Sequence, residues 1–353
     1  MCVLLQLAGC AQINYYAQAT HGQSALMAAA RPVDELLLDP ALEPKLRQRL
    51  LTANKIRQFA VDELALPDNA TYRNYAELQR PYALWNVVAT PELSMRALQW
   101  CFPIAGCVSY RGYYNEADAQ AFAAELRAAG NDVQIIGVPA YSTLGWYKDP
   151  LLSSFINYPD AEVARLMIHE LAHQIVYIQG DTQFNESFAT AVEEVGVDRW
   201  LLRYGNEQAR TTYALARERK QQFIALLLKY RQRLIDNYAA DKTDAAKREA
   251  KREIFAALQD EYQLLKRSWN GHAAYDRWFA QGLTNAHLAS VATYHDLVPG
   301  FRALLQEKDD FPQFYRAAIA LSARDKQERD QYLTSLAAGL PALSDKNAQT
   351  GAE

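Results

Sequence analysis

The sequence predicts an α+β fold that is predominantly α-helical, with a small β-sheet between flanking helical layers. Apolar residues recur at the three- and four-residue spacing of amphipathic helices over much of the chain, most clearly after residue 196. Residues 80–138 instead contain short runs of valine, isoleucine and aromatic residues, which favour strands. Half of the 353 residues are hydrophobic, enough to bury a substantial core.

Changes in composition divide the chain into a tether, a helical layer, a central core, a second helical domain and a disordered tail. Their predicted bounds are 1–20, 21–80, 81–200, 201–335 and 336–353. Residues 14–31 contain good helix formers up to Pro32, and residues 42–66 form an amphipathic helix that Pro67 ends. We expect these two segments to pack as a helical hairpin against the core.

The central region begins with a strand–helix–strand pattern. Residues 82–114 contain several β-rich segments, and Asn115 is suited to cap a helix over 116–129. Gly130 would end that helix, and residues 131–138 form the next predicted strand. A small sheet is therefore expected before residue 140.

After Gly196 the chain is almost wholly helical. Residues 207–238 and 243–267 are long, charged segments with helical periodicity, and the break at 239–243 predicts an antiparallel hairpin. We interpret their many charges as solvated faces. Residues 270–325 are predicted to form further helices.

The overall charge excludes one class of partner. The formal net charge is −4, and no basic stripe interleaved with aromatic residues occurs in the sequence. Nucleic-acid-binding domains carry such a stripe, so no nucleic-acid partner is expected. The sequence also contains no run of 18 or more apolar residues, so no membrane-spanning helix is predicted.

The most informative stretch is His169-Glu170-Leu171-Ala172-His173. Residues four apart lie on one face of a helix, about 6 Å apart along its axis, so both imidazoles can face one ion. Zinc takes nitrogen ligands of this kind and can keep one position for water. From the next position, Glu170 could take a proton from that water. The alternative is a surface helix that carries these residues by chance.

The context of this motif favours a buried helix. Asp160 is expected to cap the helix, and Gly180 is expected to follow its end. Apolar residues from Val163 to Val176 cover most sides of the segment. Imidazoles and a carboxylate in such a helix need partners, which a metal ion and its water would supply.

A second carboxylate follows in the segment Phe184-Asn185-Glu186-Ser187-Phe188-Ala189. Asn185 is expected to cap another helix, which places Glu186 in its first turn and makes it the predicted third ligand. Glu186 could instead be an ordinary first-turn acid favoured by the helix dipole. Glu193 and Glu194, two turns further along, are rival ligands.

These two segments resemble the Glu-zincin metallopeptidases, whose membrane-alanyl-type aminopeptidases carry an Asn-Glu-x-Phe-Ala segment around the third ligand. The sequence departs from that pattern because only twelve residues separate His173 from Glu186. It is more similar to a bacterial family of predicted zinc aminopeptidases, many of which are lipoproteins. That resemblance is strongest over residues 95–200, in the segments 101–113, 140–146 and 184–188.

The resemblance implies a zincin-like catalytic core that holds one zinc ion. The implied ligands are His169, His173 and Glu186. The implied reaction is hydrolysis of a peptide substrate by a zinc-activated water, with Glu170 as general base. Cleavage at the amino terminus of the substrate is implied by the resemblance alone.

The groups that contact the substrate stay open at this point. Zincins bind peptides along an edge strand, and residues 140–146 are either that strand or a connecting loop rich in aromatic residues. The alternatives for binding the substrate's α-ammonium group are Asp149, Glu193 and Glu194. Tyr294 and His287 are candidates for stabilising the oxyanion, although such residues on helices mostly serve packing or the surface.

The cysteines bear on location. Leu7-Ala8-Gly9-Cys10 resembles a bacterial lipobox, which implies a lipid anchor at Cys10 as the only link to a membrane. The implied location is the bacterial cell envelope, facing the periplasm. Most of a signal peptide is missing before Cys10, so we expect a late start or a trimmed sequence; the alternative is a short apolar terminus that packs on the core. Cys101 and Cys107 either form a disulfide or remain buried thiols.

Three classes of function are consistent with these features. The favoured class is a zinc metallopeptidase, which the resemblance makes an aminopeptidase. The second is a non-catalytic zinc-binding lipoprotein of the envelope that binds peptides or partner proteins. The third is a helical scaffold without a metal. The sequence does not predict the oligomeric state.

Overall fold

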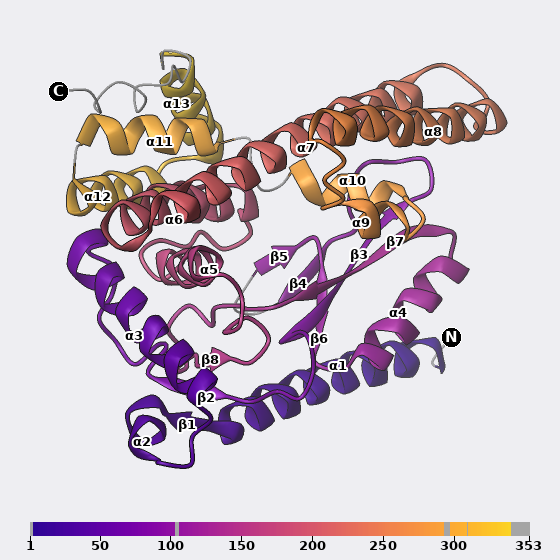
Figure 1. The fold of residues 1–353 in the computed structure, drawn as a ribbon. Helices are drawn as coiled ribbons and strands as arrows, with labels where there is room; N and C mark the ends of the chain where they lie inside the picture. Colours follow the sequence, from indigo (N-terminus) through magenta and orange to yellow (C-terminus); the bar gives the residue numbers. More distant parts are fainter. Residues whose placement is uncertain (1–2, 103–105, 293–296, 309, 340–353) are drawn as a thin grey trace.

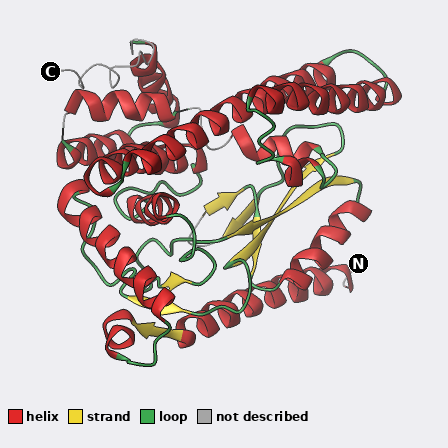
Figure 2. Ribbon diagram, viewed as in Figure 1, coloured by secondary structure: helices red, strands yellow, loops and turns green. Residues whose placement is uncertain are grey.

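A computed structural model of the chain describes residues 3–102, 106–292, 297–308 and 310–339. For residues 3–13 and Ala292 only the backbone is described. The fold is α+β and predominantly helical, as predicted, and its strands form three small sheets. Figures 1 and 2 show the strands of residues 84–138 lying between the long helix α1 (Val3–Ala29) and the paired helices α7 (Glu207–Ala239) and α8 (Asp244–Ser268). None of the described helices is long and apolar enough to cross a membrane.

The N-terminal layer contains three helices, α1 (Val3–Ala29), α2 (Val33–Leu38) and α3 (Pro44–Leu64). Helix α3 confirms the amphipathic helix predicted over 42–66. Helix α1 ends before Pro32, because Ala30–Pro32 pairs as strand β1 with β2. The N-terminal layer therefore contributes a strand to one of the three sheets as well as helices to the core.

The strands form sheets in the orders β1-β2-β8, β6-β3-β7 and β4-β5. Their bounds are β2 Asn74–Ala76, β3 Leu84–Pro91, β4 Trp100–Phe102, β5 Gly106–Val108, β6 Arg111–Tyr113, β7 Asn131–Val138 and β8 Leu151–Leu152. Strands β3 and β7 are antiparallel along their whole length, with Leu84 opposite Val138 and Val88 opposite Gln134. Because side chains alternate between the faces of a strand, this register decides which residues share a face.

Helix α4 (Glu116–Ala128) covers one face of the β6-β3-β7 sheet. Its buried Ala119 and Ala123 pack against Trp85 and Val87 of β3. The predicted cap is confirmed, since the Asn115 side chain accepts a hydrogen bond from the backbone N of Ala117 at 2.8 Å. The opposite face of the sheet is left for the site described below.

The second half of the chain contains helices α7 to α13. Their bounds are α7 Glu207–Ala239, α8 Asp244–Ser268, α9 Asp276–Phe279, α10 Asn285–Ala292, α11 Val298–Lys308, α12 Phe311–Ser322 and α13 Lys326–Ala338. Helices α7 and α8 confirm the predicted hairpin, and Leu227 and Leu258 are fully or almost fully buried in their shared core. The tail predicted from residue 336 lies outside the described residues after residue 339, and α13 continues to Ala338.

The largest core joins the N-terminal helices to the C-terminal ones around two central helices, α5 (Asp160–Ala172) and α6 (Thr182–Tyr204). Phe188 of α6 stacks on Phe314 of α12, with ring centroids 5.5 Å apart. Tyr315 donates a hydrogen bond to the Leu64 carbonyl of α3 at 2.8 Å. The helices that carry the motif are therefore enclosed on several sides, which fixes their relative position.

Candidate metal centre

Helices α5 and α6 pack closely against each other, and one glycine permits the approach. A Cβ atom added to Gly196 of α6 would lie 2.8 Å from Leu64 Cδ1 and 3.0 Å from Ile168 Cδ1. Such distances are too short for a carbon contact, so only glycine fits there without movement. The close approach brings the HExxH face of α5 to the first turns of α6.

The predicted bounds of α5 are wrong at both ends. Pro159 rather than Asp160 occupies the N-cap, and the helix ends at Ala172 with His173 as its C-cap, well before Gly180. The apolar Ile175 and Val176 continue the helical pattern in the sequence, but they pack into the core from a loop. The two histidines thus occupy the last turn of α5 and its C-cap.

The predicted cap of α6 is also wrong. Asp181 caps the helix by accepting a hydrogen bond from Phe184 N, and its carboxylate also binds Arg329 at 2.5 Å. Asn185 instead bonds both the N and the O of Ile178 at 2.8 Å, which closes the loop between the helices. Glu186 therefore lies in the second turn of α6 rather than in the first.

Three potential ligand atoms converge between the two helices. His169 Nε2 lies 3.2 Å from His173 Nε2 and 3.2 Å from Glu186 Oε2. His173 Nε2 lies 3.8 Å from the other oxygen of Glu186. Within the described residues, these three form the one cluster of histidine, cysteine and acidic side chains with metal-ligand spacing. The structure thus brings together the three ligands predicted from the sequence.

Glu193 holds the far side of one imidazole. Its Oε2 atom lies 2.7 Å from His169 Nδ1, and Arg165 lies 3.5 Å from the same oxygen. A carboxylate accepts the Nδ1 proton, so the neutral imidazole carries its lone pair on Nε2, toward His173 and Glu186. Glu193 is therefore no rival ligand but a group that orients His169. The Nδ1 atom of His173 is buried and has no such partner among the described residues.

The donor set fits zinc. Zinc takes histidine nitrogen and carboxylate oxygen at roughly 2.0–2.2 Å, and a tetrahedral site then places its ligand atoms about 3.3 Å apart. The two distances of 3.2 Å and the third of 3.8 Å are close to this spacing. Two lone pairs and a carboxylate pointing at one spot repel each other unless a cation or a proton lies between them.

The protonation of the centre reflects this crowding. Burial would lower the pKa of His169, but its hydrogen bonds to Glu186 and Glu193 raise that pKa to about 10. Burial lowers the pKa of His173 to about 4. Burial would also raise the pKa of Glu193, but Arg165 and His169 outweigh it and lower that pKa to about 2. These shifts make His169, between Glu186 and Glu193, the imidazole that carries a positive charge, while His173 stays neutral.

Glu170 is positioned for proton transfer beside this centre. It follows His169 on α5 and lines the same cavity as the three ligand residues. Burial raises its pKa to about 7, and the charge of His169 limits the rise. A carboxyl group that gains and loses a proton near neutral pH is suited to act first as a base and then as an acid.

A cavity of about 690 Å³ opens onto the centre. The hairpin β4–β5, one face of β3 and β7, and the loop after β7 form its walls. Residues 140–146 form a loop that contains a turn, and all of them except Gly145 line the cavity. The predicted edge strand is therefore wrong, and the alternative, an aromatic loop, is confirmed. Leu144 and Gly145 have positive φ angles of 56° and 80°, which no continuous strand accommodates.

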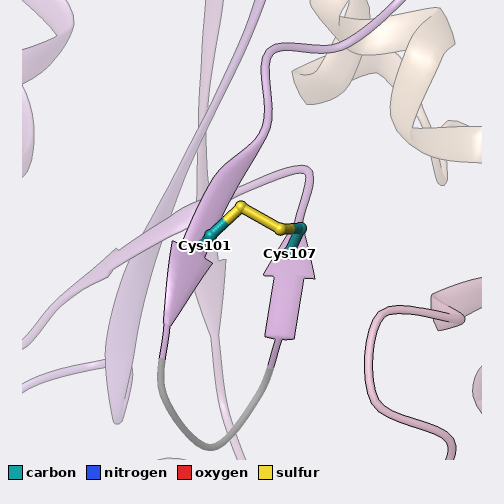
Figure 3. The surroundings of a disulfide bond; sticks show 2 residues. All are labelled: Cys101 and Cys107. Atoms are coloured by element: carbon teal, nitrogen blue, oxygen red, sulfur yellow. A yellow bond between two sulfur atoms is a disulfide. The ribbon is translucent and has the colours of Figure 1, made fainter.

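Cys101 and Cys107 form a disulfide across the β4–β5 hairpin, as Figure 3 shows. The two residues are directly opposite each other in the register of these strands. Gly106 at the start of β5 has a φ of 74°, and an added Cβ would lie 2.6 Å from Gln179 Cγ. The hairpin therefore rests directly on the loop that joins the two ligand-bearing helices.

The other candidates for contacting substrate lie elsewhere. Asp149 is buried, and its carboxylate accepts hydrogen bonds from the N and Oγ1 atoms of Thr143, both at 2.8 Å. Glu194 binds Arg302 at 3.1 Å. His287 accepts a hydrogen bond from Thr284 N and packs on Trp278, and it does not line the cavity. Tyr294 lies outside the described residues.

Two tyrosines beside the centre were not predicted from the sequence. Tyr110 follows β5 and lines the cavity, and burial, reinforced by the charges of Glu186 and Glu170, raises its pKa. Tyr177 lies in the loop after α5, with its ring centroid 6.5 Å from that of His173. No spacing rule connects Tyr110 to residues 169–186, so only the fold could reveal this proximity.

Comparison with known proteins identifies the family of the chain. Neither the curated proteins nor the solved structures contain a significant match to the chain. A family model described as "Putative aminopeptidase" matches residues 14–333. This span includes all three sheets, helices α5 and α6 and most of the C-terminal helices. By this match, the chain belongs to the family described as "Putative aminopeptidase".

Proposed function

We propose that the protein is a zinc-dependent metallopeptidase, and that it acts as an aminopeptidase. The observation that carries the metal and its chemistry is the convergence of His169 Nε2, His173 Nε2 and a Glu186 oxygen, with separations of 3.2–3.8 Å. The family match supports the peptidase class and its exopeptidase character. The cavity that opens onto the three atoms offers room for a substrate.

Each residue of the centre has a distinct part in this proposal. His169, His173 and Glu186 would hold the ion, and Glu193 would keep the His169 ring oriented through Nδ1. When bound, zinc would polarise the scissile carbonyl and acidify a water molecule. Glu170 would accept a proton from that water and would later donate it to the leaving amine.

The location proposed from the sequence has one supporting feature. The Cys101–Cys107 disulfide is typical of an oxidising compartment such as the bacterial periplasm. Attachment to a membrane would depend on a lipid at Cys10, whose side chain lies outside the described part of the chain. Growth in labelled fatty acid, followed by purification of the full-length protein, tests that attachment directly.

Metal content and turnover test the function together. Wild-type protein is expected to hold one molar equivalent of zinc by elemental analysis, and His169→Ala is expected to lose it. Glu170→Gln is expected to keep the zinc but to lower kcat on a peptide library by at least about 10²-fold. His272→Ala, at an exposed histidine far along the chain from the motif, is the matched control and should change neither quantity.

Three results would contradict the proposal in different ways. Wild-type protein without bound zinc would remove the metal chemistry altogether. Zinc binding without hydrolysis of any library peptide would instead favour a non-catalytic zinc-binding protein. Equal activity of Glu170→Gln and wild type would exclude Glu170 as the base while leaving the metal site intact.

A further inference from the structure

The face of the β6-β3-β7 sheet opposite α4 forms the floor of the cavity. Side chains on this face come from alternate residues of two paired strands, as the strand period requires. They are Leu84, Asn86 and Val88 of β3 and Ile136 and Val138 of β7, and all five line the cavity. The register places Leu84 beside Val138 and Asn86 beside Ile136. The floor is thus an aliphatic surface with one amide in it.

The walls of the cavity combine apolar and aromatic side chains with uncharged polar ones. Phe102 and Val108 of the disulfide hairpin face it from one side, and Tyr141 and Leu144 of the loop after β7 face it from another. Within the described part of the chain, the ionisable acids and histidines of its lining are all members of the metal centre, and no lysine or arginine lines it. A charged substrate side chain would therefore lose its water without gaining a partner of opposite charge on the floor.

The rim carries exposed aromatic rings. Trp146 is 70% exposed and Tyr147 is 54% exposed, and both line the cavity from its outer side. Their loop is held in shape by Asp149, which binds the backbone and the hydroxyl of Thr143, and by the bond from Tyr147 N to Thr143 Oγ1. Large exposed apolar groups beside an apolar cavity are typical of a surface that contacts a ligand.

Asn86 is the polar exception on the floor. Its Oδ1 atom is buried and has no hydrogen-bond partner among the described residues. A Cβ atom added to Gly112 of the neighbouring strand would lie 3.2 Å from this oxygen, so the amide lies flat against β6. Buried amides usually find a partner, and rotation of the Asn86 amide toward the cavity would let a peptide group of a bound substrate supply one.

We propose that this cavity selects a substrate residue with a large apolar side chain, aliphatic or aromatic, and that Asn86 hydrogen-bonds a peptide group of the same substrate. The proposal rests on the proposed peptidase function, because it names the substrate class of that site. The apolar side chain would lie on Leu84, Ile136 and Val138. The metal centre, which lines the same cavity, would hold the peptide bond.

A substrate series tests this selectivity. The series consists of aminoacyl nitroanilides of leucine, phenylalanine, alanine, lysine and aspartate, each with a free and with an acetylated amino group. For the zinc-loaded protein, kcat/KM for leucine and phenylalanine is expected to exceed that for the other three by about tenfold or more. Equal values across the series, or a preference for lysine or aspartate, would overturn the proposal.

Variants of the floor sharpen the test. Leu84→Trp fills the floor and is expected to reduce kcat/KM for phenylalanine by about tenfold while changing the value for alanine much less. Ile136→Ala enlarges the floor and should narrow the preference for leucine over alanine. The matched control is Ile135→Val, one residue away on the α4 face of β7, which should leave every ratio unchanged. A Leu84→Trp variant that folds but keeps the wild-type ratios would contradict the placement.

A binding measurement separates this inference from the proposed function. Glu170→Gln is titrated by calorimetry with the acetylated amides of leucine, phenylalanine, lysine and aspartate. Tighter binding of the first two, with weakened binding in Asn86→Leu combined with Glu170→Gln, supports the inference even if wild-type protein hydrolyses nothing. Equal binding of all four overturns it, whether or not wild-type protein is a peptidase.

Discussion

The metal centre and the α7–α8 hairpin contain the same kinds of charged side chains in opposite surroundings. In the centre, Glu193 is 3% exposed and lies between His169 and Arg165. On the hairpin, Glu261 binds Lys229 at 2.7 Å, but both side chains are open to water. A buried charge that loses its partner stays buried, whereas an exposed one is solvated again. The comparison shows that the distance within an ion pair does not by itself predict how much the pair stabilises this fold.

The largest expected effect comes from Glu193→Gln. The change removes the carboxylate from His169 Nδ1 and leaves Arg165 with Glu162 as its remaining acid, so we expect the free energy of unfolding to fall by about 3–5 kcal/mol. Zinc affinity is expected to fall by about 10- to 100-fold, because the His169 ring is no longer oriented. Urea unfolding and competition with a zinc chelator measure these two quantities.

The matched control is Glu261→Gln on the hairpin. It should change the free energy of unfolding by less than about 1 kcal/mol and leave zinc affinity unchanged. Similar losses of stability in both variants would break the comparison between the two regions.

A smaller effect is expected at Asp181, the N-cap of α6, which binds one buried and one exposed cation. Arg329→Met removes a partner that is 7% exposed and is expected to destabilise the fold by about 3 kcal/mol, near the lower end for a broken buried pair. Lys326→Met removes a partner that is 53% exposed, on the same carboxylate, and should change stability by less than about 1 kcal/mol. Urea unfolding of both variants at pH 7 measures this difference.

The two variants should also differ in zinc affinity. Asp181 fixes the start of the helix that carries Glu186, so Arg329→Met is expected to weaken zinc binding and Lys326→Met is not. Equal zinc affinity in Arg329→Met and wild type would show that the cap has no influence on the third ligand.

Features set by local spacing could be predicted from the sequence. The four-residue interval places His169 and His173 together, and the long periodic segments predict α7 and α8. Glu193 follows Glu186 by seven residues, which is two helical turns, so both face α5. Its contact with His169 Nδ1 could have been inferred from that interval once Glu186 was taken as a ligand.

Features set by tertiary contacts could not be predicted in this way. Asp181 and Asn185 are both good capping residues, and the contact with Arg329, 148 residues away in sequence, accompanies the choice of Asp181. Apolar residues at 175–176 extend the helical pattern because they are partly or fully buried, although their backbone is a loop. Over only a few residues, a buried loop and a helix can have the same pattern of apolar residues, so the predicted end of α5 was too late.

A further effect is expected only in acid, at a buried histidine that has no ion-pair partner among the described residues. Burial lowers the pKa of His287 to about 4, below its ordinary value of about 6.5. Between these two pH values the unfolded chain binds more protons than the folded chain. The stability that comes from burying His287 in its neutral form is therefore fully present above pH 6.5 and is lost as the pH falls toward 4. Because the unfolded chain protonates this imidazole, lowering the pH from 7 to 5 is expected to decrease the free energy of unfolding by about 2 kcal/mol.

His287→Gln provides the comparison, because glutamine does not titrate. Urea unfolding of wild type and of the variant at pH 7 and pH 5 should show a loss about 2 kcal/mol larger in wild type. The variant should also keep its zinc at pH 7, since His287 packs on Trp278 and lies outside the cavity lining. Parallel pH profiles would mean that the folded state can hold the charged imidazole. The contrast between buried and exposed charges would then be limited to groups joined by ion pairs, as at Glu193 and Asp181.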